Sequence, residues 1–187
     1  MELTEAQWQT VIRHTTAADH PYPGARNAPD VVMLALATLV GDVDQITASH
    51  TEYKLDAPTI WRTWAFTPSG LARVEAEFAP GEYDALEDRQ RRRRGSFDDP
   101  VEPTAINARM LPLRTATSFA VTRVYHRSWT DQFGSHLRFT PLAIEIAFGT
   151  TVERIGIRTW FDDQAKRERW EEFVAVARKA ILTGGAE

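Results

Sequence analysis

An alternation of side chains with a period of two residues runs through most of this chain and limits it to a fold built mainly from antiparallel strands. The alternation is clearest in TIWRTWAFT, Thr59 to Thr67, where β-branched and aromatic residues dominate. Pro68, Ser69 and Gly70 then form a turn signal, and LARVEAEF, Leu71 to Phe78, follows as a returning strand. The sequence therefore predicts a β-hairpin over these residues.

Further runs extend this strand pattern along the chain. We predict strands over Val31–Val40, Gln45–Lys54, Asn107–Tyr125, His136–Phe148 and Val152–Phe161. Gly41 and Asp42 are expected to form the turn between the first two, and Pro112 predicts a bend or bulge in the third. The polar and aromatic segment His126–Ser135 is expected to be a loop. With the hairpin, about seven strands result.

Helical patterns occur only at the two ends of the chain. Thr4 and Gln7 form a capping box at the start of a short helix over Thr4–Ala17, and His20–Gly24 stops it with two prolines and a glycine. Near the C-terminus an apolar stripe repeats at helical spacing and ends before Gly184. Its members are Trp170, Phe173, Val174, Ala177 and Ile181. We expect this amphipathic helix to cap the strands.

The length of 187 residues suits one domain of ordinary size with a short appendage. We assign residues 1–29 to a helix and loop appendage and residues 30–187 to a single β-domain. Within that domain, residues 79–104 contain almost no apolar periodicity and carry acids on both sides of an arginine run. This segment is predicted to be an exposed insertion loop.

Composition restricts the possible partners. The formal net charge is −4 and the pI is about 5.8, so no general positive field attracts nucleic acid or an anionic membrane. Cysteine is absent, which excludes disulfides and thiolate metal sites and fits a reducing compartment. The first residues lack the basic and apolar regions of an export signal. The apolar run Val31–Val40 has ten residues, where a membrane span needs about 20. We expect a cytoplasmic protein with no nucleic-acid or membrane partner.

No motif in the sequence indicates catalysis or a metal site. The histidines are scattered without the spacing that places two ligands on one face; they are His14, His20, His50, His126 and His136. His126, Ser128 and Asp131 include the residue types of a hydrolytic triad, but they lie within one short segment, whereas a triad usually draws on separate elements. We predict no cofactor and no metal, and favour a binding protein over an enzyme.

The order of these segments resembles the pleckstrin-homology-like (PH-like) superfold, in particular bacterial domains of unassigned function. The resemblance covers about residues 31–183 and lies in the TWAFTPSGLARVEAEF hairpin, the MLPLRTATSFAV strand, the LAIEIAFG and IGIRTWF strands, and the final helix with Trp170. It implies a mainly β, antiparallel seven-stranded sandwich or barrel with a C-terminal capping helix. Phosphoinositide-binding members carry basic residues in their first hairpin, which here is the acidic Gly41–Asp44, so the resemblance does not imply membrane binding.

The source of the chain is indicated by its basic residues. Lysine occurs only at Lys54, Lys166 and Lys179, and alanine is abundant. Arginine and alanine both come from GC-rich codons, so we predict a bacterial, actinobacterial origin.

Two exposed segments are candidate binding surfaces. Guanidinium groups grip phosphate oxygens in pairs, and four arginines follow one another in the insertion loop: Arg91, Arg92, Arg93 and Arg94. Acids on both sides of them fit a solvated loop equally well. The second segment interleaves aromatic and basic residues of the kinds enriched at interface hot spots. Its members are Tyr125, Arg127, Trp129 and Phe133, although one or two of the aromatic rings could pack onto the β-domain instead.

These observations favour a non-catalytic module that recognises a protein or peptide partner. The alternative is an antiparallel barrel that binds a small molecule in its interior, with enzymatic activity that no motif reveals. An open mouth lined by His50, Trp61 and Trp64 would favour that alternative. A third interpretation is a homodimer that pairs through an exposed edge strand or the N-terminal helix.

Overall fold

The computed structural model describes residues 2–17, 27–55, 58–79, 102–157 and 164–184. These residues form two compact units, Met1–Leu111 and Pro112–Glu187. Seven strands, three α-helices and two short 3-10 helices are present in the described ranges. The chain is therefore mainly β, as predicted. Its strands form one sheet of four and one of three, and neither sheet closes into a barrel within these ranges.

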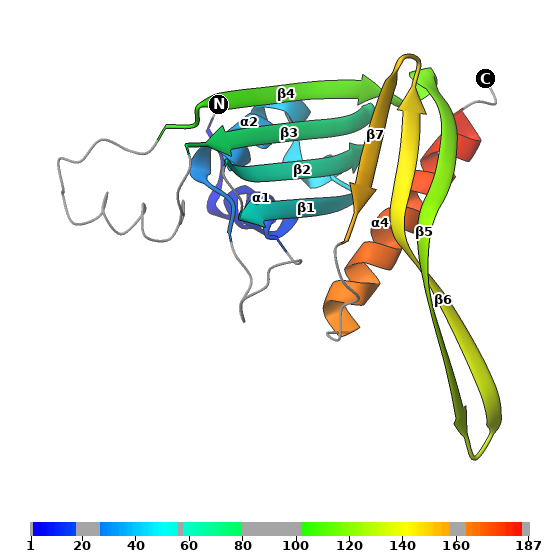
Figure 1. Ribbon diagram of the computed structural model, residues 1–187. Helices are drawn as coiled ribbons and strands as arrows, with labels where there is room; N and C mark the ends of the chain where they lie inside the picture. Colours follow the sequence, from blue (N-terminus) through cyan, green and yellow to red (C-terminus); the bar gives the residue numbers. More distant parts are fainter. Residues whose placement is uncertain (1, 18–26, 56–57, 80–101, 158–163, 185–187) are drawn as a thin grey trace, which may run out of the picture. The chain divides into compact units, whose positions relative to one another are not determined.

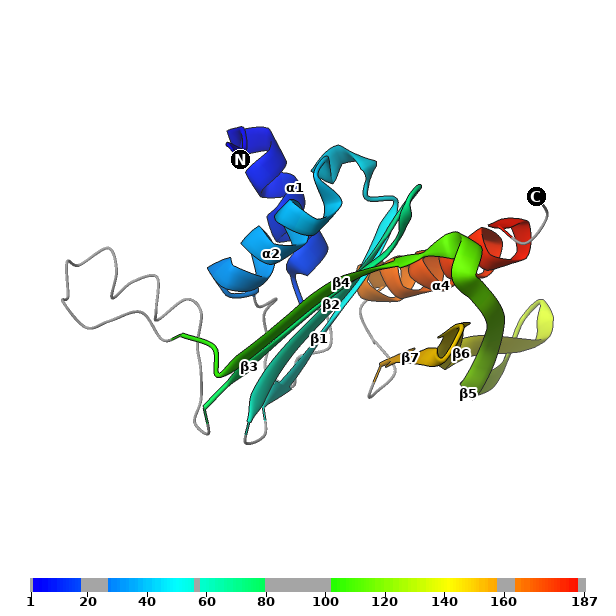
Figure 2. The ribbon, with the colours of Figure 1, turned by 90° about the horizontal axis from the view of Figure 1, so that it is seen from above.

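The first unit is a four-stranded antiparallel sheet with two helices on one face (Figures 1 and 2). Its elements are α1 (Glu5–Thr15), α2 (Asp30–Val40), η1 (Val43–Gln45), β1 (Ala48–Leu55), β2 (Thr59–Thr67), β3 (Gly70–Phe78) and β4 (Ala105–Pro112). The strands lie in the order β1-β2-β3-β4. Apolar side chains from alternate positions of the sheet pack with the two helices as the core. They include Val11, Met33, Leu36, Trp61, Val74 and Phe78.

The segment Val31–Val40 is a helix, so the prediction of a strand was wrong. A continuous apolar run of this length fits a buried strand or a buried helix, because periodicity does not distinguish them. Methionine, leucine and alanine within it favour a helix, and Asp30 lies at its positive end. Gly41 ends it with a φ of 78°, donating its N–H to the Ala37 carbonyl at 2.9 Å. Gly41–Asp44 therefore follows a helix and is not a turn between two strands.

The central hairpin and the N-terminal helix are confirmed. β2 and β3 pair in register from Thr59 opposite Phe78 to Thr67 opposite Gly70. Glycine is required at this turn because a Cβ on Gly70 would lie 2.5 Å from the carbonyl oxygen of Leu111 on β4. In α1, Thr4 and Gln7 form the expected capping box.

The second unit is a three-stranded antiparallel sheet with one long helix. Its elements are η2 (Leu113–Thr115), β5 (Ala116–Asp131), β6 (Gly134–Phe148), β7 (Thr151–Gly156) and α4 (Gln164–Gly184), and the strands lie in the order β5-β6-β7. The predicted strand Asn107–Tyr125 is interrupted after Pro112 as expected. Its two parts, however, are β4 and β5, which belong to different sheets.

His126–Ser135 is not a loop, so that prediction was also wrong. β5 continues to Asp131 and β6 begins at Gly134, which leaves a two-residue connection. The polar composition of the segment suggested a loop, but a strand with exposed faces needs no apolar alternation. Its residues pair regularly, with Arg127 opposite Arg138 and Trp129 opposite His136.

The apolar stripe of α4 is confirmed. Trp170, Phe173, Val174, Ala177 and Ile181 are all buried. The Trp170 indole Nε1 donates to the Pro141 carbonyl of β6 at 2.6 Å, which holds the helix to the sheet. The final strand is shorter than predicted: β7 ends at Gly156, and residues 158–161 lie outside the described ranges. Most of the insertion loop, 80–101, lies outside them as well.

Candidate functional site

A long two-stranded projection, which we call the arm, extends from the second unit (Figure 1). It consists of residues 124–141, because β7 pairs with β6 only from Ala143 onward, while β5 and β6 continue as a hairpin to Asp131 opposite Gly134. Successive side chains of a strand point to opposite sides. The arm therefore has two different faces.

One face of the arm, the basic face, carries three of the predicted binding residues. Tyr125, Arg127 and Trp129 lie in alternation on β5, opposite Thr140, Arg138 and His136 of β6. This face is turned toward α4, because Arg138 forms an ion pair with Glu171 of the helix at 2.7 Å. The same carboxylate oxygen accepts from the Thr140 hydroxyl at 3.4 Å.

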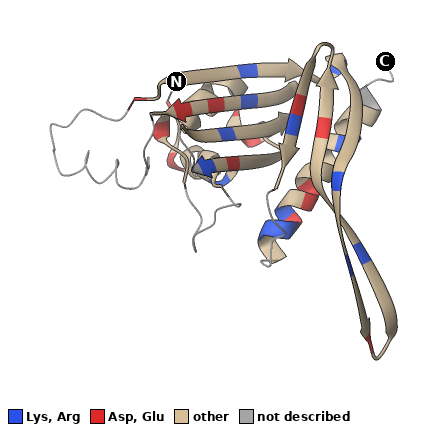
Figure 3. Cartoon of the chain, viewed as in Figure 1, with Lys and Arg blue, Asp and Glu red and all other residues tan. Residues whose placement is uncertain are grey.

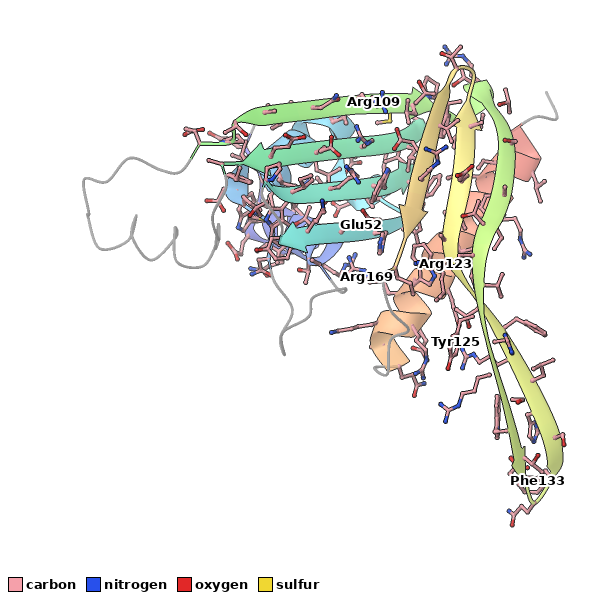
Figure 4. All side chains as sticks on the ribbon, viewed as in Figure 1. Glu52, Arg109, Arg123, Tyr125, Phe133 and Arg169 are labelled. Atoms are coloured by element: carbon pink, nitrogen blue, oxygen red, sulfur yellow. The ribbon has the colours of Figure 1, made fainter. Side chains whose placement is uncertain are left out.

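The basic face and α4 enclose a groove with a volume of about 360 Å³. It is lined by Tyr125, Arg127, Trp129, Arg138 and Arg167. Three separate elements, β5, β6 and α4, each contribute a guanidinium group, and the described residues that line the groove include no carboxylate. Glu171, which pairs with Arg138, lies beside them. Figure 3 shows basic residues on the arm and on the first turns of α4, and Figure 4 shows Tyr125 between the arm and the helix. The groove therefore suits an anionic ligand.

A ring stack and two hydrogen bonds within the arm hold Trp129 in place. Its ring stacks on His136, with centroids 5.3 Å apart. The His136 Nε2 contacts the Asp131 carboxylate at 3.0 Å, and the same carboxylate oxygen accepts from the Phe133 backbone N–H at 2.7 Å. This chain of contacts fixes the tight connection at the tip and positions the indole in the lining of the groove.

The predicted site residues fall into three groups. Tyr125, Arg127 and Trp129 line the groove. Phe133 does not: it lies at the tip of the arm with 82% of its surface exposed (Figure 4). Arg91, Arg92, Arg93 and Arg94 lie outside the described residues.

Sequence reasoning missed two lining residues, Arg138 and Arg167. Arg138 lines the groove because it lies on β6 directly opposite Arg127. The hairpin register would have revealed this pairing once the segment was recognised as two strands. Arg167 lies outside the apolar stripe of α4, and nothing in the helical pattern alone distinguishes a residue beside a groove from one in open solvent.

Two groups of residues that each contain a histidine and a serine do not form a catalytic site. His126 and Ser128 lie on the face of the arm opposite to Asp131, so these three residues do not converge. In the first unit, the buried His14 Nδ1 lies 2.9 Å from the Ser49 hydroxyl, and the Arg13 guanidinium lies 3.2 Å from Nε2. Because arginine only donates, Nε2 accepts and Nδ1 carries the proton. This imidazole therefore has no lone pair facing Ser49 to accept its proton.

Two further features of the described ranges bear on the site. His, Asp and Glu side chains do not gather in groups of three that would hold a metal ion there. Among the helices described, none combines the length and the apolar character needed to cross a membrane.

Comparison of the chain with protein-family models, with curated proteins and with solved structures finds no match.

Proposed function

We propose that this chain is a non-catalytic binding module that holds an acidic peptide segment of a partner protein in the groove between the arm and α4. The observation that carries the proposal is the convergence of three guanidinium groups with Tyr125 and Trp129 in one groove. Arginine forks bind carboxylates through paired hydrogen bonds. Aromatic rings supply apolar contact area at little conformational cost, which is why they recur at interface hot spots.

An extended peptide fits this groove because an unpaired strand edge lies beside it. β5 is an edge strand in the order β5-β6-β7, so no strand of the described sheet pairs with its outer side. Peptides commonly add to such an edge through main-chain hydrogen bonds, while flanking pockets select side chains. The backbone of β5 would align the peptide, and Arg127, Arg138 and Arg167 would select acidic residues.

A small anionic molecule is the second candidate. The volume of about 360 Å³ falls at the lower end of the range of about 300–1,000 Å³ that is typical of ligand pockets. A planar ring could stack on Trp129 while its acidic group met the arginines. The residues that would line the open mouth of a ligand-binding barrel do not line this groove. They are His50, Trp61 and Trp64, and all three are buried in the first unit.

The PH-like class and a cytoplasmic location belong to the same proposal. Seven antiparallel strands that precede a C-terminal helix support the former. The absence of cysteine supports the latter.

Fluorescence anisotropy with labelled peptides tests the peptide interpretation. We expect a fluorescein-labelled peptide of alternating glutamate and serine to bind, and its lysine counterpart not to bind. A hydrogen bond to a charged group contributes about 1.5–3 kcal/mol, so Arg127→Gln should weaken binding about tenfold or more. Arg154→Gln is the matched control, because Arg154 lies on β7 with its side chain 77% exposed and pairs with Glu145.

The same assay separates the alternatives. If neither peptide binds, or if Arg154→Gln weakens binding as much as Arg127→Gln, the proposed groove is not the binding site. If citrate or inorganic phosphate binds in an Arg127-dependent way while the acidic peptide does not, the small-anion interpretation replaces the peptide one.

A further inference from the structure

The face of the arm opposite to the groove, which we call the apolar face, carries no Asp, Glu, Lys or Arg and exposes large apolar side chains. It comprises Val124, His126, Ser128 and Thr130 of β5 and, opposite them, Pro141, Phe139, Leu137 and Ser135 of β6. The exposed fractions are 51% for Val124, 57% for Leu137 and 64% for Phe139. Neighbouring exposed residues of this size mark an interaction surface.

Only one face of the arm is covered within the described structure. A two-stranded hairpin by itself is marginally stable in water, and independent stability needs a third strand or packing against a helix. On the basic face, α4 contacts the arm through Glu171, which binds Arg138 and Thr140. On the apolar face, Leu137 and Phe139 remain more than half exposed within the described structure.

We propose that the apolar face docks against the same face of a second copy of this chain. In a two-fold symmetric contact each residue meets the same patch on its partner, so a charged patch would repel itself. None of the eight residues of this face is Asp, Glu, Lys or Arg. The basic face, in contrast, carries Arg127 beside Arg138 and could not pair with itself without that repulsion.

The dimensions of the arm indicate a weak, concentration-dependent dimer. Each strand contributes about eight residues at about 3.3 Å per residue, and the two strands lie about 4.8 Å apart. Two such faces, each about 26 Å long and about 10 Å wide, bury on the order of 500–800 Å² in contact, which is less than a stable interface needs and fits a weak association. The groove lies on the other side of the arm, so it stays accessible in each copy of the dimer. The inference of a dimer therefore does not depend on the proposed function.

Sedimentation velocity of the full chain over a range of concentrations tests the inference. We expect the sedimentation coefficient to rise with concentration, and Leu137→Glu, which would place like charges against each other, to weaken association at least about tenfold. Leu182→Glu is the matched control, because Leu182 is 71% exposed on α4, outside the arm. Circular dichroism verifies that both variants remain folded.

Cysteine cross-linking identifies the contacting face directly, since the natural chain contains no cysteine. Under mild oxidation Leu137→Cys should form a disulfide-linked dimer, whereas Arg127→Cys on the basic face should not. A wild-type chain that stays monomeric at every concentration overturns the inference. Equal association of Leu137→Glu and Leu182→Glu, or equal cross-linking of the two cysteine variants, overturns it as well.

Discussion

Trp170 joins α4 to the base of the arm, and its replacement by phenylalanine tests how the groove is held together. The indole is 2% exposed, donates to the Pro141 carbonyl at 2.6 Å and stacks on Phe173 at 5.9 Å. Phenylalanine keeps an aromatic ring but removes the donor. The carbonyl of the half-buried Pro141, which faces the buried indole, would then lose this partner, and part of the indole volume would become a cavity.

The expected cost combines these two effects. A buried acceptor left without its partner costs about 1–3 kcal/mol, and the smaller ring adds roughly 1 kcal/mol for lost packing. We therefore expect Trp170→Phe to lower the free energy of unfolding by about 2–4 kcal/mol. For a chain of this size each kcal/mol corresponds to a Tm decrease of about 2–4 °C.

Urea unfolding followed by circular dichroism measures this loss, with Trp129→Phe as the control. Trp129 is 42% exposed on the arm, so its replacement should change the free energy of unfolding by no more than about 0.5 kcal/mol. Trp170→Phe should also weaken acidic-peptide binding, because Arg167 lies on the same helix one turn away. A Trp170→Phe protein as stable as the Trp129→Phe protein would refute the anchoring role of the indole.

Two further changes test the first unit. Gly70→Ala places a methyl group against the Leu111 carbonyl oxygen and the Met110 sulfur, so we expect the free energy of unfolding to fall by about 1–3 kcal/mol. Ser69→Ala, at the neighbouring exposed turn position, is the control and should be near neutral. Thermal unfolding compares the two variants, and an equally small effect of both would show that β4 shifts to accommodate the methyl group. Thr4→Ala removes the hydroxyl that accepts from the Gln7 N–H at 3.2 Å, and should cost about 1 kcal/mol. Hydrogen exchange of the first turn of α1 measures that loss, and unchanged protection would contradict the role of the cap.

Local sequence patterns predicted correctly those elements for which the pattern indicates only one type of secondary structure. The hairpin of β2 and β3 follows from a turn signal between two alternating segments, and it is confirmed residue by residue. α1 follows from its capping box, and α4 from an apolar stripe that must be buried. Each of these signals depends on residues a few positions apart, which the sequence displays directly.

The two wrong predictions arose where a local signal was ambiguous. Val31–Val40 is apolar throughout, and burial on all sides removes the periodicity that separates a helix from a strand. His126–Ser135 is polar because much of the arm is exposed to solvent, so no apolar alternation marks its strands. In both segments the neighbouring elements, not the local pattern, decided the outcome.

The same distinction explains the groove. Sequence alone determined that the chain is mainly β and that a helix ends it, and it selected Tyr125, Arg127 and Trp129 as binding candidates by their residue types. That these three share a face follows from strand β5, where the sequence predicted a loop. Only the tertiary structure brought in Arg138, through the hairpin register, and Arg167, through the packing of α4. Contacts between residues far apart in the chain depend on register and packing, and these are properties of the assembled sheet and helix.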